Sequence, residues 1–397
     1  MRRSGILLFL LLLCTELRAQ QIAAPFKDLA DTITQVTGMA PTAGNSITTF
    51  NDGRAFLRCL LDDIDGARES IDLEFYWFDK DTVGRAVREA LIKKAQEGVR
   101  VRVLVDNLVT PLMPTAFYNK MRKAGIQFYV YHDYQNLRIW QIPSSILGTR
   151  DHRKIAVIDH RIFHTGGMNL CQVILDWKDH NIRLEGPVAA SMSNIFEQHW
   201  RRESGGAPAP FVPIPEGSGG LLCQAVDGDG SPLLEQLYIS AIRRSQRYIW
   251  LQTPYLVLPE PILEALLEQS RKGVDVRIFL PEKSDWPFMN EITREYYPAM
   301  MKAGIKLYTC DLYYDHGKGF VADDYLVCCG TMNLDKRSFR LNRENCILFY
   351  GEAMAAMMKS KYLKILETSR PVDLDKDQPS SLRKVWRNFL HSIDPLL

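Results

Sequence analysis

The stretch His152-Arg-Lys-Ile-Ala-Val-Ile-Asp159 is followed, after six residues, by Gly166-Gly-Met-Asn169. A second version of this stretch reads His316-Gly-Lys-Gly-Phe-Val-Ala-Asp323 and is followed, again after six residues, by Gly330-Thr-Met-Asn333. Histidine, lysine, aspartate, glycine and asparagine therefore recur at identical offsets. Two matched copies predict a duplicated structural unit that carries a duplicated set of polar groups.

The sequence before each motif is repeated as well. The matching segments are 71–78 with 249–256, 98–105 with 273–280, and 123–126 with 302–305. Short β-branched runs after a glycine alternate here with helical patterns, which is typical of strands that follow helix ends. This order predicts an α/β fold of two similar lobes, each a mixed or parallel β-sheet flanked by helices. We expect a pseudo-two-fold axis and one shared active site.

Composition divides the chain into six segments. The apolar run Ile6–Leu13 follows two arginines and is shorter than the ~20 residues that a bilayer span requires, so it indicates a secretory signal peptide or, alternatively, an uncleaved anchor. The predicted segments are a signal peptide at 1–19, an N-terminal segment at 20–45, lobe 1 at 46–202, a glycine- and proline-rich linker at 203–220, lobe 2 at 221–370 and a C-terminal tail at 371–397.

The length and charge of the chain argue against several classes of protein. Its 397 residues suffice for two domains, and 46% hydrophobic residues argue against disorder. The net charge is +2, and removal of residues 1–19, with their three arginines and one glutamate, leaves no net charge. A neutral chain argues against nucleic acid as a partner. The eight cysteines include no CxxC pair, which argues against a zinc ribbon.

Each motif is predicted to be a buried strand, because 155–158 and 320–322 are apolar. Side chains alternate between the two faces of a strand, so the histidine and the lysine of each motif point the same way. The residues on these two faces are His152, Lys154, His316 and Lys318. The sequence therefore predicts two histidine–lysine faces, one in each lobe.

The other polar residues of the motifs have different expected places. Asp159 and Asp323 are an odd number of residues from the histidine and the lysine, so in a regular strand their side chains point to the opposite face. We include them in the candidate site as members of the motif, although this orientation favours a structural role. The glycines before Asn169 and Asn333 are typical of a tight turn, which would bring an amide beside each histidine–lysine face.

Paired histidine, lysine and asparagine side chains suit chemistry at a phosphate. Lysine supplies a compact positive charge and asparagine a neutral donor for phosphate oxygens. Histidine can act as a nucleophile or as a proton donor near neutral pH. Two such sets facing each other would give one site with two histidines of opposite role. The alternative is a set of ordinary buried polar groups.

A histidine in such a site requires a carboxylate that fixes its tautomer and supports its cation. Candidates lie at matching chain separations, since Asp179 is 27 residues after His152 and Glu344 is 28 residues after His316. We predict both as orienting carboxylates, with solvated strand-edge charges as the alternative. The candidate catalytic residues are His152, Lys154, Asp159, Asn169, Asp179, His316, Lys318, Asp323, Asn333 and Glu344.

These residues resemble the phospholipase D superfamily, whose mark is a duplicated H-x-K-x4-D motif followed by G-[GST]-x-N. The resemblance spans roughly residues 46–370. The block Gly330–Glu344 looks like the bacterial cardiolipin synthase branch, in which N-L-D-x-R-S-F-x-L-N-x-E is typical, and Trp177–Pro187 agrees with it.

The resemblance implies a metal-independent, two-step exchange at a phosphodiester. His152 would attack phosphorus and form a phosphohistidine, and His316 would act as acid and base. A cardiolipin synthase would use two phosphatidylglycerol molecules and release glycerol. The alternatives are an exported phospholipase D that hydrolyses head groups and a nuclease of the same superfamily. We expect no cofactor and no metal ion, because His160 and His164 have ligand-like spacing without an H-E-x-x-H context.

Contact with a membrane is expected from two other segments. An apolar stripe flanked by basic residues in the tail, between Leu382 and Ile393, predicts an amphipathic helix, with packing onto its own lobe as the alternative. The insertion His132–Arg150 is absent from the second repeat and would form a rim over the site. We expect an exported protein, periplasmic or membrane-associated, whose partner is a phospholipid and whose site requires no oligomer.

Overall fold

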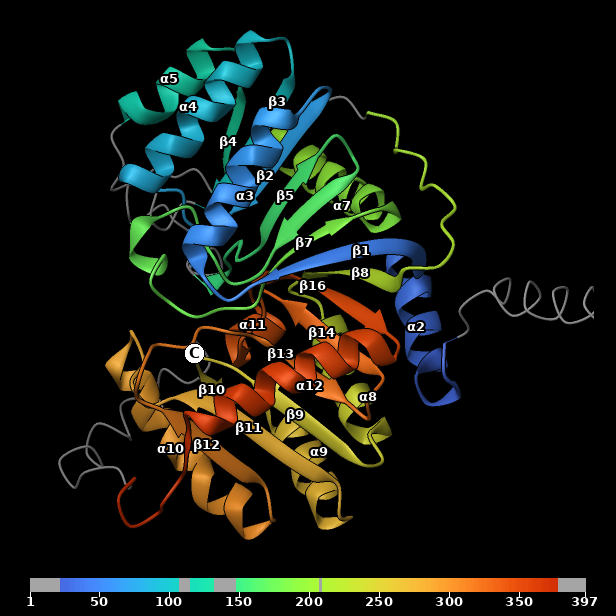
Figure 1. Ribbon diagram of the computed structural model, residues 1–397, viewed down its shortest axis with the longest axis vertical. Helices are drawn as coiled ribbons and strands as arrows, with labels where there is room; N and C mark the ends of the chain where they lie inside the picture. Colours follow the sequence, from blue (N-terminus) through green and yellow to red (C-terminus); the bar gives the residue numbers. More distant parts are fainter. Residues whose placement is uncertain (1–21, 107–114, 132–147, 207–208, 378–397) are drawn as a thin grey trace, which may run out of the picture.

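The computed structural model describes residues 22–106, 115–131, 148–206 and 209–377 (Figure 1). The expected signal peptide at 1–19, most of the insertion His132–Arg150 and the expected tail helix therefore lie outside the described residues.

Strands and helices alternate in both halves of the described chain. An N-terminal helix, α2 (Ala24–Thr37), precedes both lobes. The elements of lobe 1 are β1 (Thr42–Phe50), α3 (Gly53–Gly66), β2 (Ser70–Phe75), α4 (Thr82–Gln96), β3 (Arg100–Asp106), α5 (Thr115–Lys123), β4 (Gln127–Tyr131), β5 (Lys154–Ile158), β6 (Ile162–Thr165), the 3-10 turn η3 (Gln172–Ile174), β7 (Asn181–Glu185) and α7 (Pro187–Ser204).

Lobe 2 repeats this order after the linker. Its elements are β8 (Leu221–Asp229), α8 (Leu233–Arg244), β9 (Tyr248–Gln252), β10 (Leu256–Val257), α9 (Glu260–Arg271), β11 (Asp275–Pro281), α10 (Pro287–Lys302), β12 (Lys306–Cys310), β13 (Gly319–Ala322), β14 (Leu326–Gly330), β15 (Leu334–Asp335), α11 (Lys336–Arg340), β16 (Arg343–Tyr350), α12 (Glu352–Glu367) and β17 (Arg370–Pro371). The prediction of two similar α/β lobes is confirmed.

The two lobes share one continuous β-sheet, which the sequence did not predict. The strand order is β17-β12-β11-β9-β13-β14-β16-β8-β1-β7-β6-β5-β2-β3-β4. β2, β3 and β4 run parallel, as do β9, β11 and β12, whereas the strands between these groups pair antiparallel. Apart from the additional edge strand β17, the order of equivalent strands is the same when counted outward in either direction from the β1–β8 pair. The pseudo-two-fold axis therefore passes between β1 and β8.

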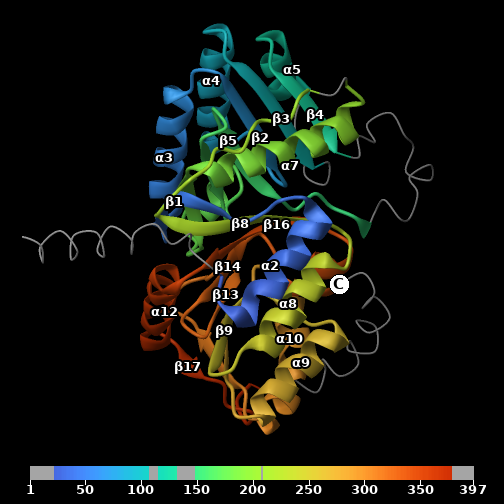
Figure 2. The ribbon, with the colours of Figure 1, turned by 90° about the vertical axis from the view of Figure 1, so that its right-hand side faces the viewer.

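Helices cover both faces of the sheet in each lobe (Figures 1 and 2). In lobe 1, α3, α4 and α5 pack on one face through a core that includes Leu60, Val87 and Met121, and α7 packs on the other. In lobe 2, α8, α9 and α10 cover one face and α12 the other. No helix among the described residues has both the length and the apolar character needed to cross a bilayer.

The described part of the predicted N-terminal segment, residues 22–45, packs against the lobes. The α2 helix packs on lobe 2, where Phe26 stacks on Tyr325 with ring centroids 6.0 Å apart. β1 begins at Thr42, which pairs with Cys223 of β8. The N-terminal segment therefore contributes to the junction between the lobes.

Candidate active site between the two lobes

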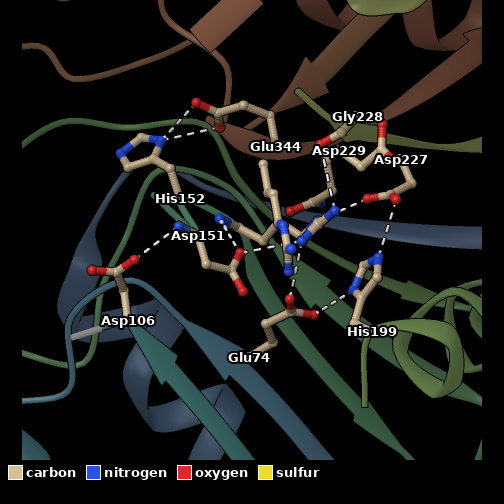
Figure 3. Close-up of polar contacts among 12 residues, drawn as sticks. Glu74, Asp106, Asp151, His152, His199, Asp227, Gly228, Asp229 and Glu344 are labelled. Atoms are coloured by element: carbon tan, nitrogen blue, oxygen red, sulfur yellow. Dashed lines mark hydrogen bonds and ion pairs between the residues drawn. The ribbon is translucent and has the colours of Figure 1, made fainter. Parts of the chain in front are cut away.

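His152 lies just before β5, which begins at Lys154, and is held by the opposite lobe. Its backbone N–H donates to the carbonyl of Arg343 at 2.9 Å. Its Nδ1 lies 3.0 Å from each carboxylate oxygen of Glu344, at the start of β16 (Figure 3). An ionised carboxylate only accepts, so Nδ1 carries the proton and Nε2 is left free to act on a substrate.

His316 is held in the same way by lobe 1. Its backbone N–H donates to the carbonyl of Lys178 at 2.7 Å, and its Nδ1 lies 2.9 Å from Oδ2 of Asp179. The predicted carboxylates thus both reach a histidine, but each reaches the histidine of the other lobe. The matching chain separations had suggested partners within one lobe. The exchange means that the site exists only when the two lobes are packed together.

The two motif lysines are buried beside the histidines. Lys154 and Lys318 are each 1% exposed, and each ammonium donates at 2.6 Å to the backbone carbonyl of the histidine two residues earlier. Burial lowers the pKa of Lys154 to about 7, with the Lys318 charge adding to the effect. Burial likewise lowers the pKa of Lys318 to about 8. The effect of the Lys318 charge on Lys154 indicates that the lysines of the two lobes are close enough to interact.

Both histidines are kept neutral in the absence of substrate. Burial lowers the pKa of His152 to about 4, although Glu344 opposes this shift. Burial and the Lys318 charge lower the pKa of His316. The carboxylates stay ionised, because Lys318 and His316 outweigh burial and lower the pKa of Asp179, while His152 and Lys154 do the same for Glu344.

The two asparagines of the motifs border the site with different partners. Asn169 accepts a hydrogen bond from the backbone N–H of Trp77 at 3.2 Å. The side-chain oxygen of Asn333 is buried and, within the described part of the chain, has no hydrogen-bond partner. An unsatisfied buried amide oxygen is costly, so it marks a place where a substrate hydroxyl or a water would bind.

Asp159 and Asp323, included among the candidate site residues, lie outside the site. Asp159 follows the end of β5 and accepts hydrogen bonds at 2.8, 2.8 and 2.9 Å from the backbone N–H groups of residues 68, 69 and 70. Asp323 accepts from residues 246, 247 and 248 in the same way. Both have positive φ angles, 49° and 52°. They tie the motif strand to the start of the neighbouring strand rather than contact the histidine–lysine face.

The two orienting carboxylates receive different support. Glu344 accepts from the hydroxyls of Thr331 at 2.5 Å and Ser338 at 2.8 Å. Asp179 accepts instead from the backbone N–H of Gly167 at 3.2 Å, where a Cβ would lie 2.1 Å from Oδ2. Sequence reasoning missed Thr331 and Ser338, although the Gly-Gly versus Gly-Thr difference between the motifs was a signal.

Aromatic rings pack against both histidines. Tyr76 contacts His152 with ring centroids 5.1 Å apart, and Trp177 and Tyr314 contact His316 at 5.1 and 5.9 Å. The hydroxyl of Tyr314 donates to Asp285 at 2.7 Å. These rings reduce water access to the imidazoles, which strengthens electrostatic interactions at the site.

A buried ionic network lies beside His152 (Figure 3). Arg153 is 0% exposed, and its guanidinium contacts Glu74, Asp151 and Asp227 at 3.3, 3.3 and 2.7 Å. His199 lies between Glu74 at 2.8 Å and Asp227 at 3.0 Å. Since Asp227 is on β8 and the others belong to lobe 1, the network joins the lobes beside the site. Sequence reasoning missed it; the arginine between His152 and Lys154 was the signal.

One group of potential metal ligands occurs among the described residues. Cys59, Asp63 and His164 each place a ligand atom within 4.8 Å of the others. The guanidinium of Arg183 already contacts both oxygens of Asp63, at 2.7 and 3.0 Å. The neighbouring His160 is directed elsewhere, since its Nδ1 lies 2.8 Å from the hydroxyl of Ser193. This chemistry is that of an ion pair rather than a metal centre.

Duplicated α/β lobes that bring two histidine–lysine pairs together define a protein of the phospholipase D superfamily. A family model described as "Cardiolipin synthase, PLD-like domain" matches residues 60–200 and 238–366. The chain therefore belongs to the cardiolipin synthase family of phospholipase D-like proteins.

Relatives and solved structures agree with this assignment. The chain is 32% identical to the major cardiolipin synthase ClsA of Bacillus subtilis over 90% of this chain and 75% of that protein. It is 28% identical to a cardiolipin synthase of Clostridium perfringens over 96% and 83% of the two chains. The fold matches a phosphatidylserine synthase from Haemophilus influenzae with a TM-score of 0.70 at 16% identity, over 93% and 99% of the two chains.

Proposed function

We propose that this protein is a phosphatidyltransferase of the cardiolipin synthase type. It exchanges a phosphodiester between two phosphatidylglycerol molecules and releases cardiolipin and glycerol. The observation that carries the proposal is the crossed pair of histidine–carboxylate contacts, which joins His152 to Glu344 and His316 to Asp179 in one site. Family membership supports the same reaction class.

The first step transfers the phosphatidyl group to His152. The neutral Nε2 attacks phosphorus, the new P–N bond forms and the P–O bond to glycerol breaks. His316, protonated once the anionic phosphodiester is bound beside it, gives its Nε2 proton to the departing glycerol oxygen. Glu344 supports the positive charge that develops on the His152 ring.

The second step returns the group to an alcohol. His316 is now neutral and removes the proton from a hydroxyl of the second phosphatidylglycerol, whose oxygen attacks phosphorus and breaks the P–N bond. Lys154 and Lys318 neutralise the charge on the non-bridging oxygens in both steps. The oxygen of Asn169 accepts from Trp77, which leaves its amide N–H groups to donate to these oxygens, and the free oxygen of Asn333 accepts from a substrate hydroxyl.

The hydrogen-bond donors around Glu344 differ from those around Asp179, and the difference favours His152 as the nucleophile. Glu344 is fully buried and accepts from two hydroxyls in addition to the ring of His152. A rigid, ionised partner stabilises the cationic phosphohistidine, which has to survive until the second substrate arrives. Asp179 has backbone donors instead, and its histidine has only to shuttle a proton.

The substrate is a membrane lipid, so we place the enzyme at a membrane surface. Large apolar side chains are exposed on three segments around the site: Val173 in η3, Trp286 before α10 and Leu312 between β12 and His316, with exposed fractions of 52, 58 and 69%. Such residues suit peripheral insertion into the head-group region. Export across the inner membrane, with a periplasmic or membrane-associated location, is part of the same proposal.

Incubation with phosphatidylglycerol vesicles tests the function. Cardiolipin and glycerol are the expected products. Phosphatidic acid and glycerol without cardiolipin would instead establish an exported phospholipase D that transfers the group to water, and the absence of any lipid turnover would overturn both.

A further inference from the structure

The residue between histidine and lysine differs between the two motifs, and so do the side chains around it. Lobe 1 has Arg153 at this place, whereas lobe 2 has Gly317. The sheet register shows what surrounds the two positions: Glu74 of β2 pairs with Ile155, and Gln252 of β9 pairs with the equivalent Gly319. Gln252 is therefore the counterpart of Glu74.

The other partners of Arg153 also have counterparts in lobe 2. Asp227 of β8 pairs with Asn345, and the equivalent register of β1 and β7 assigns Asn51 to that position. His199 and Lys364 occupy the same place counted from the first residues of α7 and α12. Two carboxylates are thus replaced by neutral amides and an imidazole by a lysine. Lobe 2 therefore lacks the guanidinium and two of the three carboxylates that hold it in lobe 1.

A cavity of about 430 Å³ lies where lobe 1 has its ionic network. Its lining includes Asn51, Lys364 and Asp315, which are the counterparts of Asp227, His199 and Asp151. The catalytic histidines do not line it. The cavity is therefore separate from the phosphodiester site, although Asp179 belongs to both.

A buried polar group in this cavity lacks a partner. His180 is 2% exposed and its ring lies beside the amide of Gln252, but within the described residues its Nδ1 has no hydrogen-bond partner. Native proteins rarely leave such a group unsatisfied, so it indicates a bound molecule. The Cδ2–Nε2 edge of His180 faces Gly317, which leaves Nδ1 on the opposite side of the ring.

The charges around the cavity favour an anion. Three lysines line it, of which Lys361 donates at 3.0 Å to the backbone carbonyl of Asp179. Two carboxylates oppose them, but that of Asp179 is engaged by His316, and Asp315 accepts from the N–H of Gly317 at 3.0 Å. Burial raises the pKa of Asp315 and lowers that of Lys361 to about 8. Both groups can hold a proton when an anion binds beside them, so the cavity can accommodate additional negative charge.

We propose that this cavity is a second binding site, which takes a phosphate group outside the active site. Lys361 and Lys364 line the cavity and are available to donate to its oxygens, and His180 supplies a ring nitrogen. The methionines of α12, Met354, Met357 and Met358, form an adjoining apolar wall. Free phosphate and the head group of a phospholipid share this chemistry, and the wall would receive the glycerol and acyl part of a lipid.

Lysine labelling resolved by peptide mass spectrometry tests the proposal on the full-length protein. Acetic anhydride at pH 8 labels lysines individually, so the cavity and the active site are read separately. Inorganic phosphate, or dihexanoyl phosphatidic acid, should slow labelling of Lys361 and Lys364 at least threefold relative to sodium chloride of equal ionic strength. Exposed Lys27 on α2 should be unaffected. Protection by both probes would show that a phosphate group alone is sufficient for binding. Protection by the lipid alone would show that binding requires the head group together with its acyl chains.

Two variants of α12 test whether the protection from labelling arises in the cavity. Ser360 lines the cavity mouth and is exposed, so Ser360→Trp should fill it and remove the protection. Leu363, 43% exposed and not part of the lining, provides the control Leu363→Trp, which should keep it. Labelling of Lys361 that is unchanged by either probe in the wild-type protein would overturn the proposal. Because the readout requires no turnover, this failure is distinct from a failure to form cardiolipin.

Discussion

Glu344 and His152 belong to opposite lobes, yet Nδ1 of the imidazole lies 3.0 Å from both oxygens of the carboxylate. His316 and Asp179 form the reciprocal contact at 2.9 Å. Each lobe thus supplies the reactive ring of one pair and the orienting carboxylate of the other. Correct packing of the lobes is a condition for either histidine to have its catalytic tautomer.

Glu344→Gln should impair catalysis without unfolding the protein. The amide keeps the shape but cannot support an imidazolium at His152, so we expect kcat to fall by roughly 10³-fold or more while KM changes little. Steady-state kinetics on phosphatidylglycerol vesicles measures the effect. The control Glu203→Gln removes a carboxylate that contacts only Arg343 among the described residues and should retain activity. A Glu344→Gln enzyme with kcat within tenfold of the wild type would contradict the assigned role.

The pH profile of kcat/KM should be a plateau bounded by the buried groups. Activity is expected to fall below pH 4, where His152 becomes protonated and loses its nucleophilic lone pair. It should also fall as the pH rises, first through the lowered pKa of His316, which has to carry the proton that it gives to glycerol, and then through 7 to 8, because Lys154 and Lys318 lose the charges that bind the phosphodiester. A rate that keeps increasing to pH 9 would show that the lysine charges are not required.

Asp159→Asn should reduce stability and leave the chemistry intact. Its carboxylate accepts three backbone hydrogen bonds, so the substitution should lower the free energy of unfolding by about 1–2 kcal/mol. Urea unfolding and kcat per folded molecule are the two measurements, and Asp323→Asn should behave alike. A large loss of kcat in a stable, folded Asp159→Asn protein would place the residue in the reaction after all.

His199 should stabilise the junction of the lobes in a pH-dependent way. Burial and Arg153 lower its pKa, but Asp227 and Glu74 outweigh them and raise it to about 9, above the ordinary value of 6.5. Folding therefore favours the protonated ring. The resulting stabilisation is complete below pH 6.5 and is lost as the pH rises through 9.

His199→Gln reveals this contribution. The substitution leaves Glu74 and Asp227 with only Arg153 and should cost about 3 kcal/mol at pH 7 in urea unfolding. The difference from the wild type should shrink at pH 10. His160→Gln is the matched control, since its ring is held by a serine hydroxyl rather than carboxylates and its effect should not change between these pH values. Equal losses for His199→Gln at pH 7 and pH 10 would refute the protonated state.

The residue pattern predicted the lobes and both histidine–lysine pairs because those features are local and repeated. The place of Asp159 followed from strand parity, although the actual cause is that β5 ends at Ile158 and Asp159 adopts a positive φ. The exchange of carboxylates was not predictable, since chain separation says nothing about how two lobes pack. The continuous sheet depends on the β1–β8 pair, whose strands lie outside the recognised repeats.

The claim that both motif histidines act on one phosphorus atom is tested most directly by trapping the covalent intermediate. The wild-type enzyme is mixed with ³²P-labelled phosphatidylglycerol, quenched in alkali, where phosphoramidates survive, and digested for peptide mapping. We predict label on the peptide that carries His152, its loss in His152→Ala, and its accumulation in His316→Ala when the substrate has a nitrophenol leaving group that needs no acid. Label on a peptide without either motif histidine, or turnover that persists in His152→Ala, would contradict the account.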